Sequence, residues 1–132
     1  MFRLDDSPQF CNLLSWYVPR PALASVDVVG VKEFFGTSLC LIYWTLGLAA
    51  FQDCPLEFDE RINRSKNNGT AAVERDHPEL AAGIRRLLQP DLELYAAARR
   101  KFFGAVAEME RVTGLRFEEV RGSPEYTEHF AP

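Results

Sequence analysis

Apolar side chains recur at helical spacing in the second half of the chain, and this pattern predicts two successive helices. The first is expected over residues 76–88, with Asp76 as its cap. Its apolar face is formed by Leu80, Ile84, Leu87 and Leu88. Pro90 ends this helix and opens a second one over residues 90–112, which Gly114 should terminate. The apolar face of this second helix is formed by Leu92, Tyr95, Ala98, Phe102, Ala105, Met109 and Val112.

Two apolar segments dominate the first half of the chain. Val26–Val31 is a β-branched run with almost no polar alternation, which is typical of a strand buried on both faces. Phe34–Phe51 then carries no charge over 18 residues. That length only just reaches the thickness of a bilayer, and the flanks lack the run of basic residues expected on a cytoplasmic side. The segment therefore favours a helix buried inside a folded domain over a membrane span.

The remaining segments have weaker patterns. Residues 8–17 predict a short helix, which starts at Ser7 and is stopped by the prolines that follow. Residues 52–75 are polar and contain glycine, as expected of a loop. The tail over residues 113–132 has little periodicity and predicts an extended or partly disordered end. The fold class expected from these patterns is mostly α with one or two short strands.

Composition supports one globular domain over residues 1–132, because 47% of the residues are hydrophobic and 26% are charged. The formal net charge of −4 argues against indiscriminate binding to nucleic acid or to anionic membranes, so any anion site must be local. The first residues do not form a signal peptide, which predicts a cytoplasmic protein. Cys11, Cys40 and Cys54 are expected to be free, buried thiols, with a Cys40–Cys54 disulfide as the alternative.

Few residues offer chemistry. His77 and His129 have no companion ligand at metal-binding spacing, and hydrolase or dinucleotide motifs are not found, so no metal is expected. A strand, loop and helix around Lys32–Ser38 imitate a phosphate loop, but Glu33 and two phenylalanines oppose an anion there.

The better anion candidate is the loop over residues 63–70, in which cations, amides, hydroxyls and a glycine lie close together. The alternative is an ordinary solvated turn. Two glycosylation sequons in this loop, at Asn63 and Asn68, matter only in a secreted chain.

Three segments, in this order, resemble the C-terminal portion of the PAPS-dependent sulfotransferases of the carbohydrate type, which includes the heparan sulfate enzymes. Residues 28–39 are similar to a late strand with a Val-Gly-Leu-Thr-Glu pattern and the helix after it. Residues 61–66 resemble a Leu-Asn-x-Ser segment before a basic, nucleotide-contacting loop. Residues 91–102 resemble a closing helix with an Asp-x-x-Leu-Tyr signature and a later Phe. The likeness runs from about residue 20 to residue 105.

The resemblance implies the C-terminal part of an α/β fold with a parallel sheet, spanning residues 26–112, with residues 1–25 as an N-terminal helix and linker. It also implies a family role, the transfer of a sulfuryl group from PAPS to a hydroxyl, with a carbohydrate as the expected acceptor. The residues implied to contact PAPS or its product PAP are Arg64, Lys66, Gly69 and Thr70. Lys32 stands where the family often has Thr, and Asn67-Asn68 replace residues that are often basic or small.

The family's N-terminal phosphosulfate-binding elements and its general base have no match in this sequence, so no catalytic residue is assigned. The chain is therefore expected to be inactive alone. The rival hypothesis is a non-enzymatic helical interaction or oligomerisation module. Its partner would be a second chain or a second copy, bound through Val26–Val31, the apolar helix and the face with Tyr95 and Phe102. A small membrane-anchored protein is the third reading.

Overall fold

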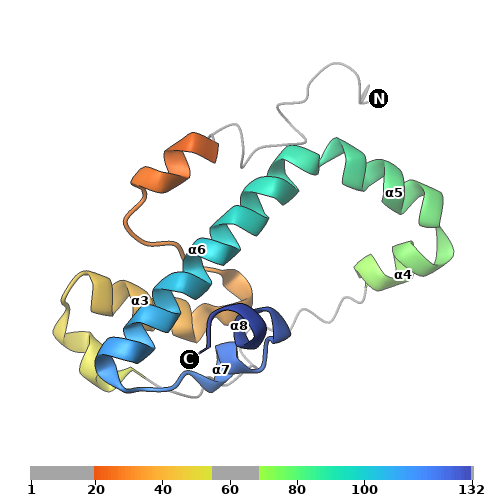
Figure 1. The fold of residues 1–132 in the computed structure, drawn as a ribbon. Helices are drawn as coiled ribbons and strands as arrows, with labels where there is room; N and C mark the ends of the chain where they lie inside the picture. Colours follow the sequence, from red (N-terminus) through yellow and green to blue (C-terminus); the bar gives the residue numbers. More distant parts are fainter. Residues whose placement is uncertain (1–19, 55–68, 132) are drawn as a thin grey trace. The chain divides into compact units, whose positions relative to one another are not determined.

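The computed structural model describes residues 20–54 and 69–131, and the part it describes is mainly helical (Figure 1). The chain divides into two compact units, Met1–Ala24 with Glu60–Ala96 and Ser25–Asp59 with Ala97–Pro132. The helix predicted over residues 8–17 and Cys11 lie outside the described residues.

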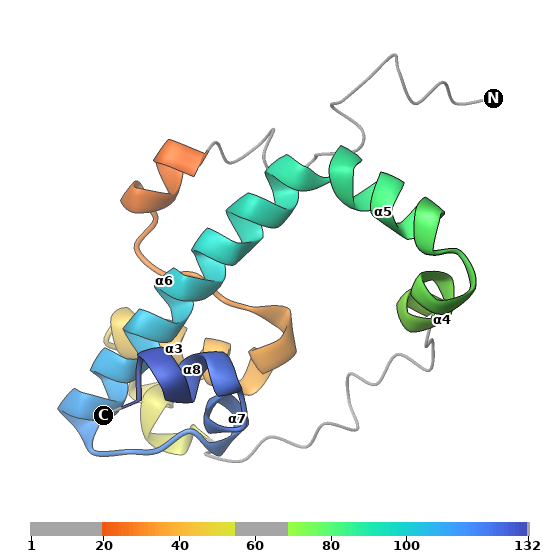
Figure 2. The same cartoon turned by 45° about the vertical axis from the view of Figure 1, so that its right-hand side comes forward.

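The first unit contains α4 (Gly69–Asp76) and α5 (Pro78–Leu87), the two helices that follow the predicted loop in the sequence. Helix α4 occupies part of the segment that was expected to be a loop, so that prediction is wrong for its last residues. Helix α5 follows after His77, and Figure 2 shows the corner between α4 and α5. Asp76 is the last residue of α4, and the N-cap position of α5 belongs to His77 instead. An ion pair between Glu74 and Arg85 links the two helices.

The long helix α6 (Gln89–Thr113) confirms the helix predicted over residues 90–112, and it contributes residues to both units. Gly114 ends it with a φ of 73°, a left-handed conformation that glycine adopts without a Cβ clash. The Gly114 N–H donates to the Glu110 carbonyl over 2.8 Å, which closes the last turn. The buried positions of its second half are Phe102, Phe103, Val106, Met109 and Glu110.

The strand predicted at Val26–Val31 is not formed, and the described part of the chain contains no strand. Val31 has extended backbone angles, φ −121° and ψ 126°, but a strand is stable only beside another strand. A short 3-10 turn, η2 (Lys32–Phe34), follows directly, and another, η1 (Arg20–Ser25), precedes the segment. The described chain is therefore mostly α, and the sheet implied by the resemblance has no counterpart in it.

The uncharged segment Phe34–Phe51 does not form one long helix. Helix α3 (Phe35–Thr45) ends two residues before Gly47, whose φ of 65° reverses the chain before the 3-10 helix η3 (Ala49–Asp53). A disulfide joins Cys40 in α3 to Cys54, with the two Cα atoms 5.7 Å apart. The expectation of free thiols is wrong for these two residues, because the turn at Gly47 brings positions 14 apart in sequence together. None of the helices in the described part combines the length and the hydrophobicity that crossing a bilayer requires.

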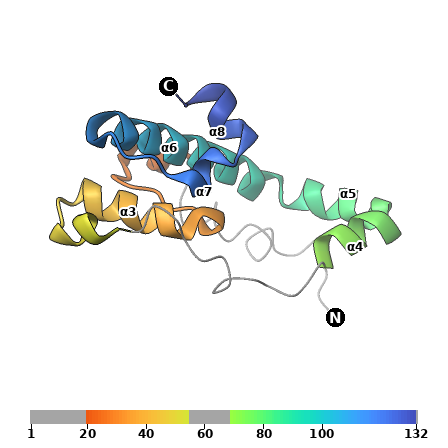
Figure 3. The same ribbon diagram turned by 90° about the horizontal axis from the view of Figure 1, so that it is seen from below.

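The tail is ordered and helical, which corrects the prediction of an extended or disordered end. It contains α7 (Glu118–Arg121) and α8 (Pro124–His129). Phe117, Val120 and Tyr126 have no exposed surface, so the tail supplies core to the second unit. In Figure 3, α7 lies between α3 and the second half of α6. Burial against these neighbours stabilises helices too short to persist in isolation.

Candidate functional site

The predicted nucleotide loop is described only at its end. Arg64 and Lys66 lie outside the described residues, whereas Gly69 and Thr70 are the first two residues of α4. The loop therefore leads into a helix N-terminus, where backbone N–H groups lack partners within the helix and the helix dipole is positive. This end of a helix is suited to an anion, and it is the one feature of the predicted site that the structure describes.

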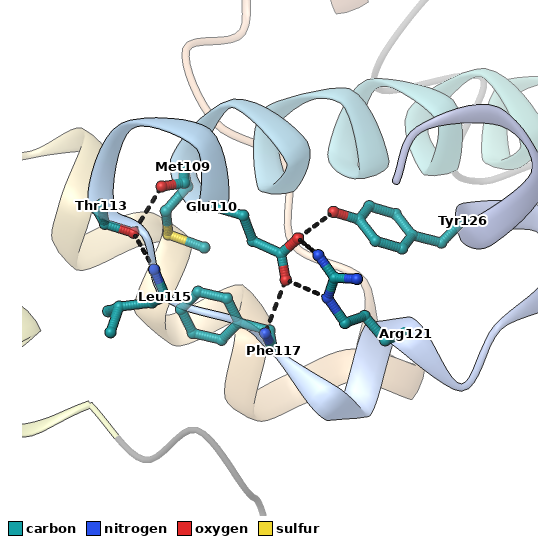
Figure 4. Close-up of polar contacts among 7 residues, drawn as sticks. All are labelled: Met109, Glu110, Thr113, Leu115, Phe117, Arg121 and Tyr126. Carbon is teal, nitrogen blue, oxygen red and sulfur yellow. Dashed lines mark hydrogen bonds and ion pairs between the residues drawn. The ribbon is translucent and has the colours of Figure 1, made fainter. Parts of the chain in front are cut away.

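The most extensive polar cluster of the described residues surrounds Glu110, a carboxylate on the core face of α6 (Figure 4). Its Oε1 accepts hydrogen bonds from the Phe117 N–H at 2.8 Å and from Arg121 Nε at 3.1 Å. Its Oε2 accepts from Arg121 Nη2 and from the Tyr126 hydroxyl, both at 2.7 Å. One carboxylate thus ties α6 to the start of α7 and to α8.

The electrostatics of this cluster favour the charged form of Glu110. Burial alone would raise the pKa of Glu110, but hydrogen bonds from Arg121, the Phe117 N–H and Tyr126 outweigh it, and the pKa lies below its ordinary value. Burial and the hydrogen bond to Glu110 raise the pKa of Tyr126, so the phenol stays protonated and remains a donor. The bidentate contact with Glu110 raises the pKa of Arg121.

The cluster is consequently structural. Both oxygens of Glu110 already accept two hydrogen bonds each, which fills the lone-pair positions that a general base or metal ligand needs. No buried side-chain nitrogen or oxygen among the described residues lacks a partner. In the same part of the chain, His, Cys, Asp and Glu form no group of three that could hold a metal ion.

A second carboxylate closes the start of α3. Glu119 Oε2 accepts hydrogen bonds from the Thr37 N–H at 2.9 Å and from the Thr37 hydroxyl at 2.7 Å. The N–H groups in the first turn of a helix have no partner within it, so this contact from α7 serves as a cap. It also joins α7 to α3.

The extended segment is held against α3 by a side chain. The Val31 N–H donates to Ser38 Oγ at 2.8 Å, and that hydroxyl donates to the Val31 carbonyl at 3.0 Å. A Cβ added to Gly30 would lie 3.3 Å from the Ser38 Cβ, so glycine permits the close approach. Gly30 and Ser38 both belong to the first segment of the sulfotransferase resemblance, and their contact is structural.

An aromatic cluster fills the core beside these contacts. The rings of Phe34 and Phe102 are stacked at 5.9 Å, and Phe103 lies 5.6 Å from each of Phe34 and Tyr126. The guanidinium of Arg99 lies 5.3 Å from the centre of the Phe34 ring, and its Nε donates to Glu125 at 2.8 Å. Phe102, the last residue of the third segment of the resemblance, is fully buried here.

Two open pockets lie elsewhere in the described part. One of about 320 Å³ is lined by Tyr43, Trp44, Gly47, Leu48, Ala49, Phe51 and Gln52. The other surrounds the corner between α4 and α5 at His77 and has a volume of about 440 Å³. His77 and His129 are exposed, and neither belongs to a group of three potential metal ligands among the described residues.

No protein-family model matches the chain, and comparisons with curated proteins and with solved structures give no significant match.

Sequence reasoning missed the Glu110 cluster and gave the Cys40–Cys54 disulfide only as the alternative to free thiols. A signal for the cluster exists, because Glu110 lies beside Met109 on an otherwise apolar helix face and therefore needs a cationic partner. That partner, Arg121, lies in the tail whose ordering was not predicted.

Proposed function

We propose that the chain is the C-terminal portion of a carbohydrate-type PAPS-dependent sulfotransferase and forms one wall of the nucleotide site. In the family reaction a sulfuryl group leaves the phosphosulfate for an acceptor hydroxyl, the hydroxyl proton passes to a base, and PAP is released. No residue of this chain is assigned as that base. Under this proposal, the chain alone binds the nucleotide but does not transfer sulfate.

The observation that carries the proposal is the start of α4 at Gly69–Thr70. The basic segment with Arg64 and Lys66 leads directly into a helix N-terminus. Cationic side chains and the N–H groups of a first helical turn are together the donor set that a phosphate or sulfate requires. These donors are of the type that would bind the phosphates of PAP. PAPS, when bound, would supply the activated sulfuryl group.

The segment Val26–Val31 supports the proposal, because its strand-like sequence has no neighbouring strand among the described residues. Its residues are extended at Val31 and lie in no helix, yet they pair with no strand among the described residues. A parallel strand needs a neighbour on at least one side, and in the proposed whole enzyme that neighbour comes from the preceding sequence.

Calorimetry with PAP tests the proposal. We expect saturable binding to the wild type and its loss in Arg64→Ala/Lys66→Ala. The matched control is Arg75→Ala/Arg86→Ala, which removes the same charge from exposed positions in α4 and α5 and should bind as the wild type does. Absence of binding at millimolar PAP would contradict the nucleotide assignment, as would equal losses in the two double variants.

A second candidate function, a helical interaction module, is favoured by the apolar face of α5. Leu80, Ile84 and Leu87 are 57%, 42% and 41% exposed, and they lie on one side of the helix at spacings of four and three. An uncovered apolar stripe of this kind marks a protein contact more often than chance exposure. The face with Phe102 proposed from the sequence is not available, because that side chain is fully buried.

Association measured by sedimentation over a range of concentrations tests the second candidate. The variant Ile84→Glu places a charge in the centre of the stripe, and Ala82→Glu places the same charge at an exposed position on the opposite side of α5. Self-association that is lost only in Ile84→Glu supports the module. A chain that is monomeric at all concentrations and still binds PAP would contradict the interaction module and support the sulfotransferase proposal.

A further inference from the structure

The turn between α3 and η3 exposes an uncharged apolar surface that neither candidate function uses. The six residues from Thr45 to Ala50 are all exposed, and Thr45 is the one polar side chain among them. Leu46 is 60% exposed and Leu48 is 46% exposed. We call residues 43–52 the apolar tip. Charged side chains are lacking throughout the sequence between Glu33 and Asp53, so the apolar tip has no charge of its own.

Several backbone N–H groups of the apolar tip donate to carbonyls within it. The Leu48 N–H donates to the Tyr43 carbonyl at 2.8 Å, and the Gly47 N–H donates to the Trp44 carbonyl at 3.1 Å. These two bonds with Gly47 at φ 65° form a Schellman motif. The Phe51 N–H donates to the Leu48 carbonyl at 3.1 Å. Because these donors already have partners, moving the apolar tip out of water costs less than it would for an ordinary loop.

The base of the apolar tip is fixed covalently. The Cys40–Cys54 disulfide joins α3 to the end of η3 and closes the segment that contains the turn. Cys40 is fully buried in the second unit, so the disulfide fixes both ends of the apolar tip to the core. A fixed segment loses less conformational entropy on binding than a free one.

The side chains of the apolar tip are of the kinds found at a membrane interface. Leu46 and Leu48 are the exposed aliphatic groups, and Tyr43, Trp44 and Phe51 are half-buried beside them. Tyr and Trp prefer the headgroup level of a bilayer, where one end of the ring is apolar and the other is wet. The open pocket of about 320 Å³ beside these rings is lined mainly by apolar residues, which suits hydrocarbon.

We infer that the apolar tip inserts into the surface of a zwitterionic lipid bilayer. A lipid surface fits better than a protein partner because protein interfaces carry a polar rim that fixes orientation, whereas the exposed residues of this surface offer only Thr45 and Gln52 for hydrogen bonds. The polar ends of the half-buried Tyr43 and Trp44 suit the headgroup level of a bilayer. A zwitterionic surface fits better than an anionic one because the chain has a net charge of −4 and the apolar tip contains no Lys or Arg.

Sedimentation with phosphatidylcholine vesicles tests the inference on the full chain with its disulfide intact. We expect measurable partition of the wild type, and a fall of about tenfold or more in Leu46→Glu, because a buried leucine contributes that much to transfer from water. Leu48→Glu should behave in the same way. The matched control is Val112→Glu in α6, which changes an aliphatic side chain that is 55% exposed and lies outside the apolar tip, and it should partition as the wild type does.

Three results would overturn the inference. The first is no partition of the wild type at millimolar lipid. The second is an equal loss in Val112→Glu and Leu46→Glu, which would mean that general hydrophobicity drives the binding. The third is partition that requires added phosphatidylglycerol, because an uncharged tip on an acidic chain cannot depend on anionic lipid. Each variant changes a side chain that is largely exposed, and an unchanged circular dichroism spectrum confirms that it folds. PAP binding is measured separately, so failure of the proposed function leaves this test intact.

Discussion

The substitution Glu110→Gln should lower the stability of the second unit strongly. Glutamine keeps the size of the side chain and one carbonyl oxygen, but it removes the charge and replaces an acceptor with an N–H₂ donor. That donor would face groups that themselves donate to Glu110, Arg121 Nη2 and the Tyr126 hydroxyl. The Tyr126 hydroxyl can turn to accept, whereas the guanidinium cannot.

The magnitude follows from the burial of the ion pair. The side chains of Glu110 and Arg121 are 2% and 19% exposed, so Arg121 recovers only part of its hydration when its partner is neutralised. Breaking a buried pair by removing one charge costs about 3–5 kcal/mol, and the partial access of Arg121 to water places the expected loss near the lower end, at about 3 kcal/mol. For a domain of this size the melting temperature should fall by on the order of 10 °C.

Thermal denaturation followed by far-ultraviolet circular dichroism measures the loss, and Glu108→Gln is the matched control. Glu108 lies on the same helix and pairs with Arg111 at 2.6 Å, but both side chains are more than half exposed. Exposed pairs of this kind stabilise proteins little, so Glu108→Gln should leave the melting temperature almost unchanged. Equal shifts in the two variants would refute the reasoning that burial makes the Glu110 contacts important.

Three further predictions concern pH, the disulfide and the end of α6. The pKa of Glu110 is lowered from 4.5, so its contribution to the free energy of unfolding is complete above pH 4.5 and is lost as the pH falls through the lowered pKa. In a pH series, the difference in melting temperature between wild type and Glu110→Gln should therefore narrow below pH 4.5. In urea denaturation, Cys40→Ser/Cys54→Ser should lower the free energy of unfolding by about 3 kcal/mol, because the bridge spans 14 positions, and reduced wild type should match the double variant. Gly114→Ala should cost about 1 kcal/mol because φ is 73°, whereas Gly83→Ala, inside α5 with open space around it, should stabilise the chain in the same assay.

The helices that could be predicted from the sequence are those whose signal is local. α5 and the long α6 have apolar residues at helical spacing and a proline or glycine near their ends, and both form close to the predicted bounds. The apolar face of α5 was predicted correctly as a stripe, but its exposure could not be, because periodicity shows which residues share a face and not what covers that face.

The elements that could not be predicted depend on contacts between distant residues. α7 and α8 have four and six residues, too few for a helix to persist without tertiary burial, and the burial of Phe117 and Tyr126 is not visible in their local pattern. The disulfide depends on the reversal at Gly47. Val26–Val31 has a strand-like composition, but whether such a run becomes a strand is decided by the presence of a neighbour.

The candidate site divides the residues of the sulfotransferase resemblance into two kinds. Ser38 holds the extended segment through Val31, and Phe102 stacks on Phe34 in the core, so these two motif residues already have structural partners. The packing of the second unit therefore accounts for both side chains, and neither is available to a nucleotide. The proposed affinity for PAP is assigned to the basic loop and the start of α4, because Arg64, Lys66 and the N–H groups of a first helical turn lie there. The comparison of Arg64→Ala/Lys66→Ala with Arg75→Ala/Arg86→Ala tests this assignment, since only the first pair lies in one of the three segments that carry the resemblance and neither pair belongs to the core of the second unit.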